Sequence, residues 1–203
     1  AERGWSRFVY PTAAQTFFAR NREALLTQSI DYLPIGEFRE GAIGKIASGN
    51  GAYLARSMLP KGDPAYLQWD QPRVGEAFIR AIQESESSRL LLSSEMFALP
   101  EVGAWSEFVA LCEREGIGLR FIAAVRNHFD WLTSAYLQGV KRHQVTEEPG
   151  VFIRRLYKST RHLKYATYFS ALSTLCEERI EFISYDQGTA NGRLLDLFQR
   201  ALG

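Results

Sequence analysis

The feature that most restricts the fold is a short apolar run, Phe121–Val125, which stops at Arg126 and is followed at once by a helical pattern. A short run of this kind is typical of a buried parallel strand. The residues after it place Phe129, Leu132 and Tyr136 near one stripe of a helix. We therefore expect Arg126 at the carboxyl end of a strand, where open α/β sheets bind their ligands.

The same alternation of apolar runs and helical patterns extends along the chain. It predicts helices and a few short strands, with an irregular glycine-rich stretch at 36–51. The strands are expected at 8–10, 30–33, 90–93, 119–125 and 180–184, and the helices at 13–28, 52–58, 74–86, 105–115, 129–142, 151–157, 161–176 and 192–202. This order predicts a single α/β domain, residues 1–203, with a parallel β-sheet flanked by helices on both faces.

Composition sets wide limits on function. Hydrophobic residues make up 46% and charged residues 23% of the 203 residues, which is ordinary for a soluble globular protein. The formal net charge of +1 does not favour nucleic-acid binding. Cys112 and Cys176 show no metal-ligand spacing, so we expect no metal and a cytoplasmic location; a disulfide between them stays open. No stretch has the length and hydrophobicity of a membrane span.

A second polar residue follows Arg126 at a useful spacing. Ser134 lies eight positions on (134 − 126), about 9–12 Å along the predicted helix. A guanidinium fork and a hydroxyl suit one bound phosphate. The alternative is an arginine packed at the sheet edge and a serine packed in the helix, and spacing alone does not separate the two.

Residues 125–141 resemble the 3′-phosphate-binding signature of sulfotransferases that use 3′-phosphoadenosine 5′-phosphosulfate (PAPS), and are similar to its bacterial, glycan-directed branch. Three further segments resemble parts of that family in the expected order: 21–26 the end of the first helix, 90–95 the strand before the catalytic base, and 180–186 the last strand. The resemblance implies a P-loop-containing nucleotide-binding fold and PAPS as sulfate donor. It implies a glycan or glycolipid hydroxyl or amine as acceptor.

The resemblance also implies roles for individual residues. Arg126 and Ser134 would hold the 3′-phosphate, and Glu95 would be the catalytic base, although a carboxylate there also suits the cap of a following helix. His128 is a second candidate base, with a structural role as its alternative. Residues 185–186, Tyr-Asp, resemble a structural pair that ties the sheet edge to neighbouring loops.

The chain departs from the family at the phosphate loop. Residues 8–18 contain neither the lysine nor the glycine expected there, and retain Thr12 and Thr16 at the start of a helix that is able to bind the 5′-phosphosulfate. Arg7 and Lys45 are candidate replacement cations. Two functions follow: a PAPS-dependent sulfotransferase, or a catalytically impaired nucleotide-binding or scaffold member of the same fold. A phosphate-loop kinase is disfavoured because the Walker lysine is missing.

Overall fold

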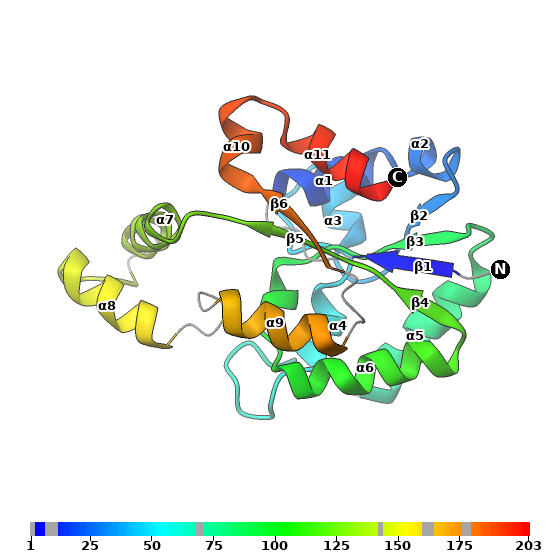
Figure 1. Cartoon of the computed structure of the whole chain (residues 1–203), viewed down its shortest axis with the longest axis horizontal. Coiled ribbons are helices and arrows are strands. Elements are labelled where there is room, and N and C mark those ends of the chain that lie inside the picture. The colour runs from blue at the N-terminus through cyan, green and yellow to red at the C-terminus, as the bar shows by residue number, and fades with distance from the viewer. Residues whose placement is uncertain (1–2, 7–11, 68–70, 142–143, 160–164, 176–179) are drawn as a thin grey trace.

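The fold is described from a computed structural model, which places residues 3–6, 12–67, 71–141, 144–159, 165–175 and 180–203 (Figure 1). The strands in these ranges are β1 (Arg3–Ser6), β2 (Ile30–Tyr32), β3 (Arg89–Leu91), β4 (Ile117–Leu119), β5 (Phe121–Val125) and β6 (Ile180–Ser184). The helices are α1 (Thr12–Arg20), α2 (Arg22–Leu26), α3 (Phe38–Ala42), α4 (Ala52–Ser57), α5 (Gln71–Glu84), the 3-10 helix η1 (Glu95–Ala98), α6 (Val102–Arg114), α7 (His128–Lys141), α8 (Pro149–Ser159), α9 (Tyr165–Leu175), α10 (Tyr185–Ala190) and α11 (Leu194–Leu202). The predicted strand 8–10 lies outside the described residues.

The strands pair in parallel, as predicted, but in two sheets. One has the order β2-β3-β1-β4, and the other consists of β5 and β6. The single strand predicted at 119–125 is wrong, because the chain is divided at Arg120 into β4 and β5. Arg120 forms an ion pair with Glu181 of β6 at the surface, and from this point β5 pairs with β6. The two sheets continue one another in space (Figure 1).

Helices cover both faces of this layer, which confirms the predicted α/β arrangement. Leu90 and Phe121 pack in a core with α4, α5, α6 and α9, whereas the adjacent Leu91 and Ile122 pack in a second core with α1, α2 and α11. In Figure 1 these two groups of helices lie on opposite sides of the strands. Because alternate side chains point to opposite faces, Leu90–Leu91 of β3 and Phe121–Ile122 of β5 are apolar on both sides.

Two short helices form where none was predicted. α3 lies inside the glycine-rich stretch expected to be irregular, and it packs closely on α1. A Cβ at Gly41 would lie 3.1 Å from the Cβ of Ala19, so the missing side chain permits this approach. α10 begins directly after β6, where the hydroxyl of Ser184 accepts a hydrogen bond from the N–H of Gln187 at 3.3 Å.

Cys112 is a buried free thiol on α6. Burial raises the pKa of this thiol to about 12, with smaller contributions from Glu113 and Glu115. It therefore stays protonated at neutral pH and packs as a small apolar side chain, as expected from the sequence. Cys176 lies outside the described residues.

A buried carboxylate on the middle residue of β2 joins three segments of the chain. The side chain of Asp31 is 5% exposed, and its Oδ1 accepts hydrogen bonds from Arg22 of α2, with Nε and Nη2 both at 2.8 Å. Its Oδ2 accepts a hydrogen bond from the hydroxyl of Ser85 at 2.8 Å. Since removal of one partner leaves the others buried without a counter-charge, this network is sensitive to substitution.

Asp31→Ala is expected to lower the free energy of unfolding by about 3 kcal/mol, because Arg22 and Ser85 lose their acceptor. Urea denaturation measures the change. Asp196→Ala is the matched control: its partner Arg193 lies at 3.3 Å, both side chains are more than half exposed, and the loss should stay below about 1 kcal/mol. Equal losses in the two variants would contradict this assignment.

Candidate functional site

The strand order locates the crevice in which a sheet of this kind binds ligands. β1 is followed in the chain by β2, on the far side of β3, whereas β3 is followed by β4, on the far side of β1. The connections from these two neighbouring strands leave in opposite directions, and ligands bind outside the carboxyl ends of the strands at such a point. The helix α1 follows β1, and Ser93, Ser94 and Glu95 follow β3.

A buried amide, Asn50, organises this edge. Its Nδ2 donates to the carbonyl oxygens of Leu33 and Leu91, both at 2.9 Å. Its Oδ1 accepts from the N–H of Ser93 at 2.8 Å, and its own N–H donates to the hydroxyl of Tyr32 at 3.3 Å. One side chain therefore joins the carboxyl ends of β2 and β3 to the glycine-rich loop.

Unpaired polar groups lie beside this anchor. Gln15 of α1 is 1% exposed and Ser93 is 0% exposed, yet the two amide atoms of Gln15 and the hydroxyl of Ser93 have no hydrogen-bond partner among the described residues. Gly49 packs against both, since a Cβ there would lie 2.0 Å from the carbonyl oxygen of Ser93 and 3.2 Å from Cδ of Gln15. Buried polar groups without partners are costly, so this cluster is a candidate for contact with a polar ligand.

Glu95 lies at this edge, as the sequence predicts. It is the half-buried first residue of η1, and Phe97 of the same turn packs over Gly51, where a Cβ would lie 2.4 Å from Cε2 of the ring. The side-chain cap of η1 comes from Ser94, whose hydroxyl accepts a hydrogen bond from the N–H of Met96 at 3.0 Å. The capping role considered for Glu95 is thus filled by its neighbour.

Arg126 follows β5 at the carboxyl edge. Its Nε lies 3.9 Å from Oδ1 of Asp186, longer than a hydrogen bond, and its Cζ lies 5.1 Å from the centre of the Tyr185 ring. Nε has no hydrogen-bond partner among the described residues. Asp186 also accepts a hydrogen bond from the N–H of Asn127 at 2.7 Å. Residues 185–186 therefore tie the end of β6 to the end of β5, which confirms their predicted structural role.

Ser134 lies on α7, half-buried and without a described hydrogen bond to Arg126. α7 packs against α8, with the rings of Tyr136 and Phe152 at 5.5 Å between centres. The two helices lie beyond the end of β5, at one end of the molecule (Figure 1). The structure places Arg126 and Ser134 on consecutive elements without direct contact.

His128 begins α7 between two tyrosines. Its ring centre lies 4.6 Å from that of Tyr165 on α9 and 6.5 Å from that of Tyr157 on α8. The hydroxyl of Tyr165 donates to the carbonyl oxygen of Arg126 at 3.3 Å, and burial is the main cause of the raised pKa of this phenol. Nε2 of His128 is buried and has no hydrogen-bond partner in the described part of the chain. Two unpaired nitrogens, of Arg126 and His128, therefore belong to the same short connection.

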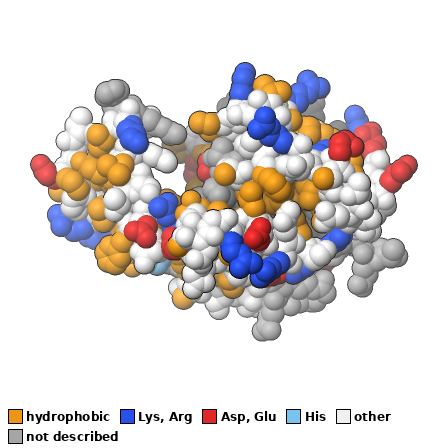
Figure 2. Space-filling view, turned by 90° about the horizontal axis from the view of Figure 1, so that it is seen from above, with side chains coloured by type: hydrophobic (Ala, Val, Ile, Leu, Met, Phe, Trp, Pro, Cys, Tyr) orange, Lys and Arg blue, Asp and Glu red, His pale blue; other side chains and the backbone are white. Residues whose placement is uncertain are grey.

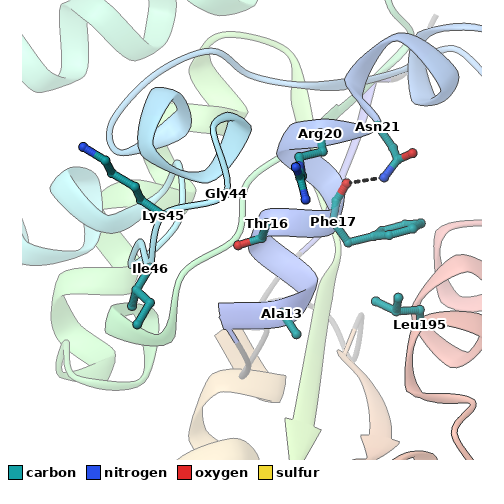
Figure 3. A pocket seen from close by; sticks show the side chains of 9 residues that line it. All are labelled: Ala13, Thr16, Phe17, Arg20, Asn21, Gly44, Lys45, Ile46 and Leu195. Atoms are coloured by element: carbon teal, nitrogen blue, oxygen red, sulfur yellow. Dashed lines mark hydrogen bonds between the residues drawn. The ribbon is translucent and has the colours of Figure 1, made fainter.

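A pocket of about 460 Å³ runs along the side of α1 (Figure 3). It is lined by apolar and basic residues, namely Ala13, Thr16, Phe17, Arg20, Asn21, Gly44, Lys45, Ile46 and Leu195. A Cβ at Gly44 would lie 3.7 Å from Cζ of Arg20, so this loop packs against the last turn of α1. The structure brings Lys45 to the same pocket as Thr16, but beside the later turns of the helix. Thr12 is the first residue of α1, and neither its side chain nor Arg7 is among the parts described.

Sequence reasoning missed Gln15, Asn50 and Arg20 as members of these sites. Gln15 carries a detectable signal, because it is a polar residue next to the buried Ala14 in the first helix. Asn50 carries a weaker one, since asparagine between glycines is ordinary in a loop.

The described residues contain no group of three or more His, Cys, Asp or Glu side chains placed to hold a metal ion. Nor do they include a helix with the length and hydrophobicity needed to cross a membrane. Comparisons with protein-family models, curated proteins and solved structures gave no match.

Two nearly isosteric substitutions test whether Gln15 is unpaired. Gln15→Met is expected to leave the free energy of unfolding unchanged or to raise it by about 1 kcal/mol, because no hydrogen bond is lost. Asn50→Leu should lower it by about 3 kcal/mol or more, because two carbonyls and one N–H lose their partner. Urea denaturation without ligand measures both. A loss above about 1 kcal/mol in Gln15→Met would show that the Gln15 amide is paired in solution.

Proposed function

We propose that this protein is a sulfotransferase that moves a sulfuryl group from PAPS to a hydroxyl or amine of a carbohydrate acceptor, on a P-loop-like nucleotide-binding architecture. The observation that carries the proposal is the position of Arg126 and the lack of a hydrogen-bond partner at its Nε among the described residues. Arg126 lies at the carboxyl end of a parallel strand, oriented by Asp186 and Tyr185. A planar fork held in this way suits the 3′-phosphate, and Ser134 on the next helix adds a hydroxyl.

The 5′-phosphosulfate is assigned to the start of α1. The amides of the first turn and the hydroxyls of Thr12 and Thr16 are the donors we assign to it. The buried Gln15 and Ser93 supply polar groups on the side of β3. This assignment agrees with the switch point between β1 and β3, where a ligand of the sheet is expected.

Glu95 is assigned as the base. Its carboxylate would take the proton of the acceptor hydroxyl as that oxygen attacks sulfur. The bond between sulfur and the 5′-phosphate oxygen breaks, and its electron pair stays with the leaving 3′-phosphoadenosine 5′-phosphate. The position of Glu95 after β3, two residues beyond the buried Ser93, supports this role. Positioning and electrostatics supply most of the rate in such transfers.

A catalytically impaired, nucleotide-binding protein is the second candidate, favoured by the missing lysine. Lys45 packs beside the later turns of α1, so it is poorly placed to replace that lysine at the start of the helix. One positioned donor to developing charge is worth about 2.7–4 kcal/mol. Under this second function the protein binds 3′-phosphoadenosine 5′-phosphate and transfers sulfate slowly or not at all. A transfer assay from radiolabelled PAPS to a mixed glycan panel separates the two functions.

The nucleotide assignment predicts a requirement for the 3′-phosphate. Calorimetric titration should show tighter binding of 3′-phosphoadenosine 5′-phosphate than of 5′-AMP by about 1.5–3 kcal/mol. Arg126→Lys should remove most of this difference, because a point charge does not reproduce a fork. Arg120→Lys, at an exposed arginine paired with Glu181, serves as control and should keep the difference. Equal affinity of the parent protein for both nucleotides would exclude the assignment.

The base assignment predicts a loss of rate without a loss of binding. Glu95→Gln should lower turnover in the transfer assay by roughly 10²–10⁴-fold and leave the affinity for 3′-phosphoadenosine 5′-phosphate unchanged. The exposed Glu86 supplies the control, and Glu86→Gln should retain full turnover. Normal turnover in Glu95→Gln would remove Glu95 from the mechanism, and a joint loss of affinity would make it a nucleotide-positioning residue.

A further inference from the structure

The pocket beside α1 has a basic side. Arg20 and Lys45 line it, both are exposed, and none of the nine lining residues is acidic. Neither cation forms an ion pair with another described residue. Thr16 contributes a hydroxyl to the same lining, and in Figure 3 it lies between Arg20 and Ile46. Two unpaired cations with a hydroxyl attract an anionic group.

The same pocket has an apolar side. Phe17, Ile46 and Leu195 line it, and Ile46 is 91% exposed. Figure 2, which views the face formed by α1 and α11, shows hydrophobic side chains gathered there among Lys and Arg side chains. Covering the exposed Ile46 and the half-buried Phe17 with a ligand removes apolar surface from water and favours binding.

We propose that this pocket binds an anionic amphiphile, with the acidic head group at Arg20 and Lys45 and the apolar part against Ile46 and Phe17. The volume of about 460 Å³ lies within the range of small-molecule sites, about 300–1,000 Å³. The charge and the apolar lining together define the ligand class, since an inorganic anion leaves the apolar side exposed and a neutral amphiphile leaves the cations unpaired. The site lies along the side of α1 and shares the lining residue Thr16 with the proposed transfer site, whereas Arg20, Lys45 and Ile46 have no role in the proposed transfer reaction.

Octyl phosphate, used as a monomer below its critical micelle concentration, is the probe. Calorimetry should show binding at least about tenfold tighter than that of inorganic phosphate or of the neutral octyl glucoside, since each lacks one half of the recognition. Lys45→Gln and Arg20→Gln should each weaken octyl phosphate about threefold to tenfold. Lys61→Gln, at an exposed lysine outside the pocket, should change nothing.

Two isoleucines of one loop give the sharpest control. Ile46 lines the pocket, whereas Ile43, which is 67% exposed, does not. Ile46→Ser should weaken octyl phosphate without affecting inorganic phosphate, and Ile43→Ser should leave both unchanged. Both positions are exposed, so neither change threatens folding.

Three results would overturn the proposal. Equal effects of Ile43→Ser and Ile46→Ser would show adsorption to the loop surface. Binding to phosphatidic acid vesicles without binding of monomeric octyl phosphate would show attraction to a charged bilayer in place of a pocket ligand. Displacement of octyl phosphate by 3′-phosphoadenosine 5′-phosphate would make the pocket part of a nucleotide site, with Lys45 as its cation.

Discussion

The side-chain hydrogen bonds of Asn50 hold the carboxyl edge of the sheet together. β2 and β3 are each three residues long, so their ladder contains few backbone hydrogen bonds. Asn50 adds bonds to the carbonyls that follow or end these strands and to the N–H of Ser93. The N–H of Gly51 donates to the carbonyl of Ser93 at 3.2 Å, which docks the glycine-rich loop on the same edge. The direction in which the chain leaves β3 toward Glu95 therefore depends on one buried amide.

At the other end of the carboxyl edge, charged side chains hold the ends of β5 and β6 together. Asp186 accepts a hydrogen bond from the N–H of Asn127 and faces the guanidinium of Arg126, whose other neighbour is the ring of Tyr185. These contacts restrict Arg126 without using its Nε in a hydrogen bond to a described residue. A hydrogen-bond donor that is already oriented and has no acceptor loses little conformational entropy when an anion binds. This low entropic cost favours strong electrostatic binding.

Local pattern predicts the strands that are short, apolar and followed by breakers, whereas β1, which contains Arg3 and Gly4, was not predicted. The strand at 180–184 is confirmed as β6, and the run at 30–33 differs from β2 only at its end. Contacts between residues far apart in the sequence could not be predicted from local pattern. Asn50 lies 17 positions from Leu33 and 41 from Leu91, so no local pattern connects them. α3 likewise depends on the close approach of Gly41 to Ala19 of α1. Helix and loop propensities describe single positions and do not include such a contact.

For the site residues, too, local features were predicted from the sequence and long-range contacts were not. The pattern placed Glu95, Arg126 and Ser134 on their elements, because strand ends are readable from composition. It did not predict that α7 would pack against α8, and no hydrogen bond joins Ser134 to Arg126 among the described residues. Nor did it predict that the loop carrying Lys45 would pack, through Gly44, against the last turn of α1. The two halves of the proposed nucleotide site thus differ in their cations. The half at Arg126 has a positioned guanidinium, whereas the half at the start of α1 depends on amides and hydroxyls. Under the proposed function, affinity for a 3′-phosphate and stabilisation of a leaving 5′-phosphate would therefore be separable.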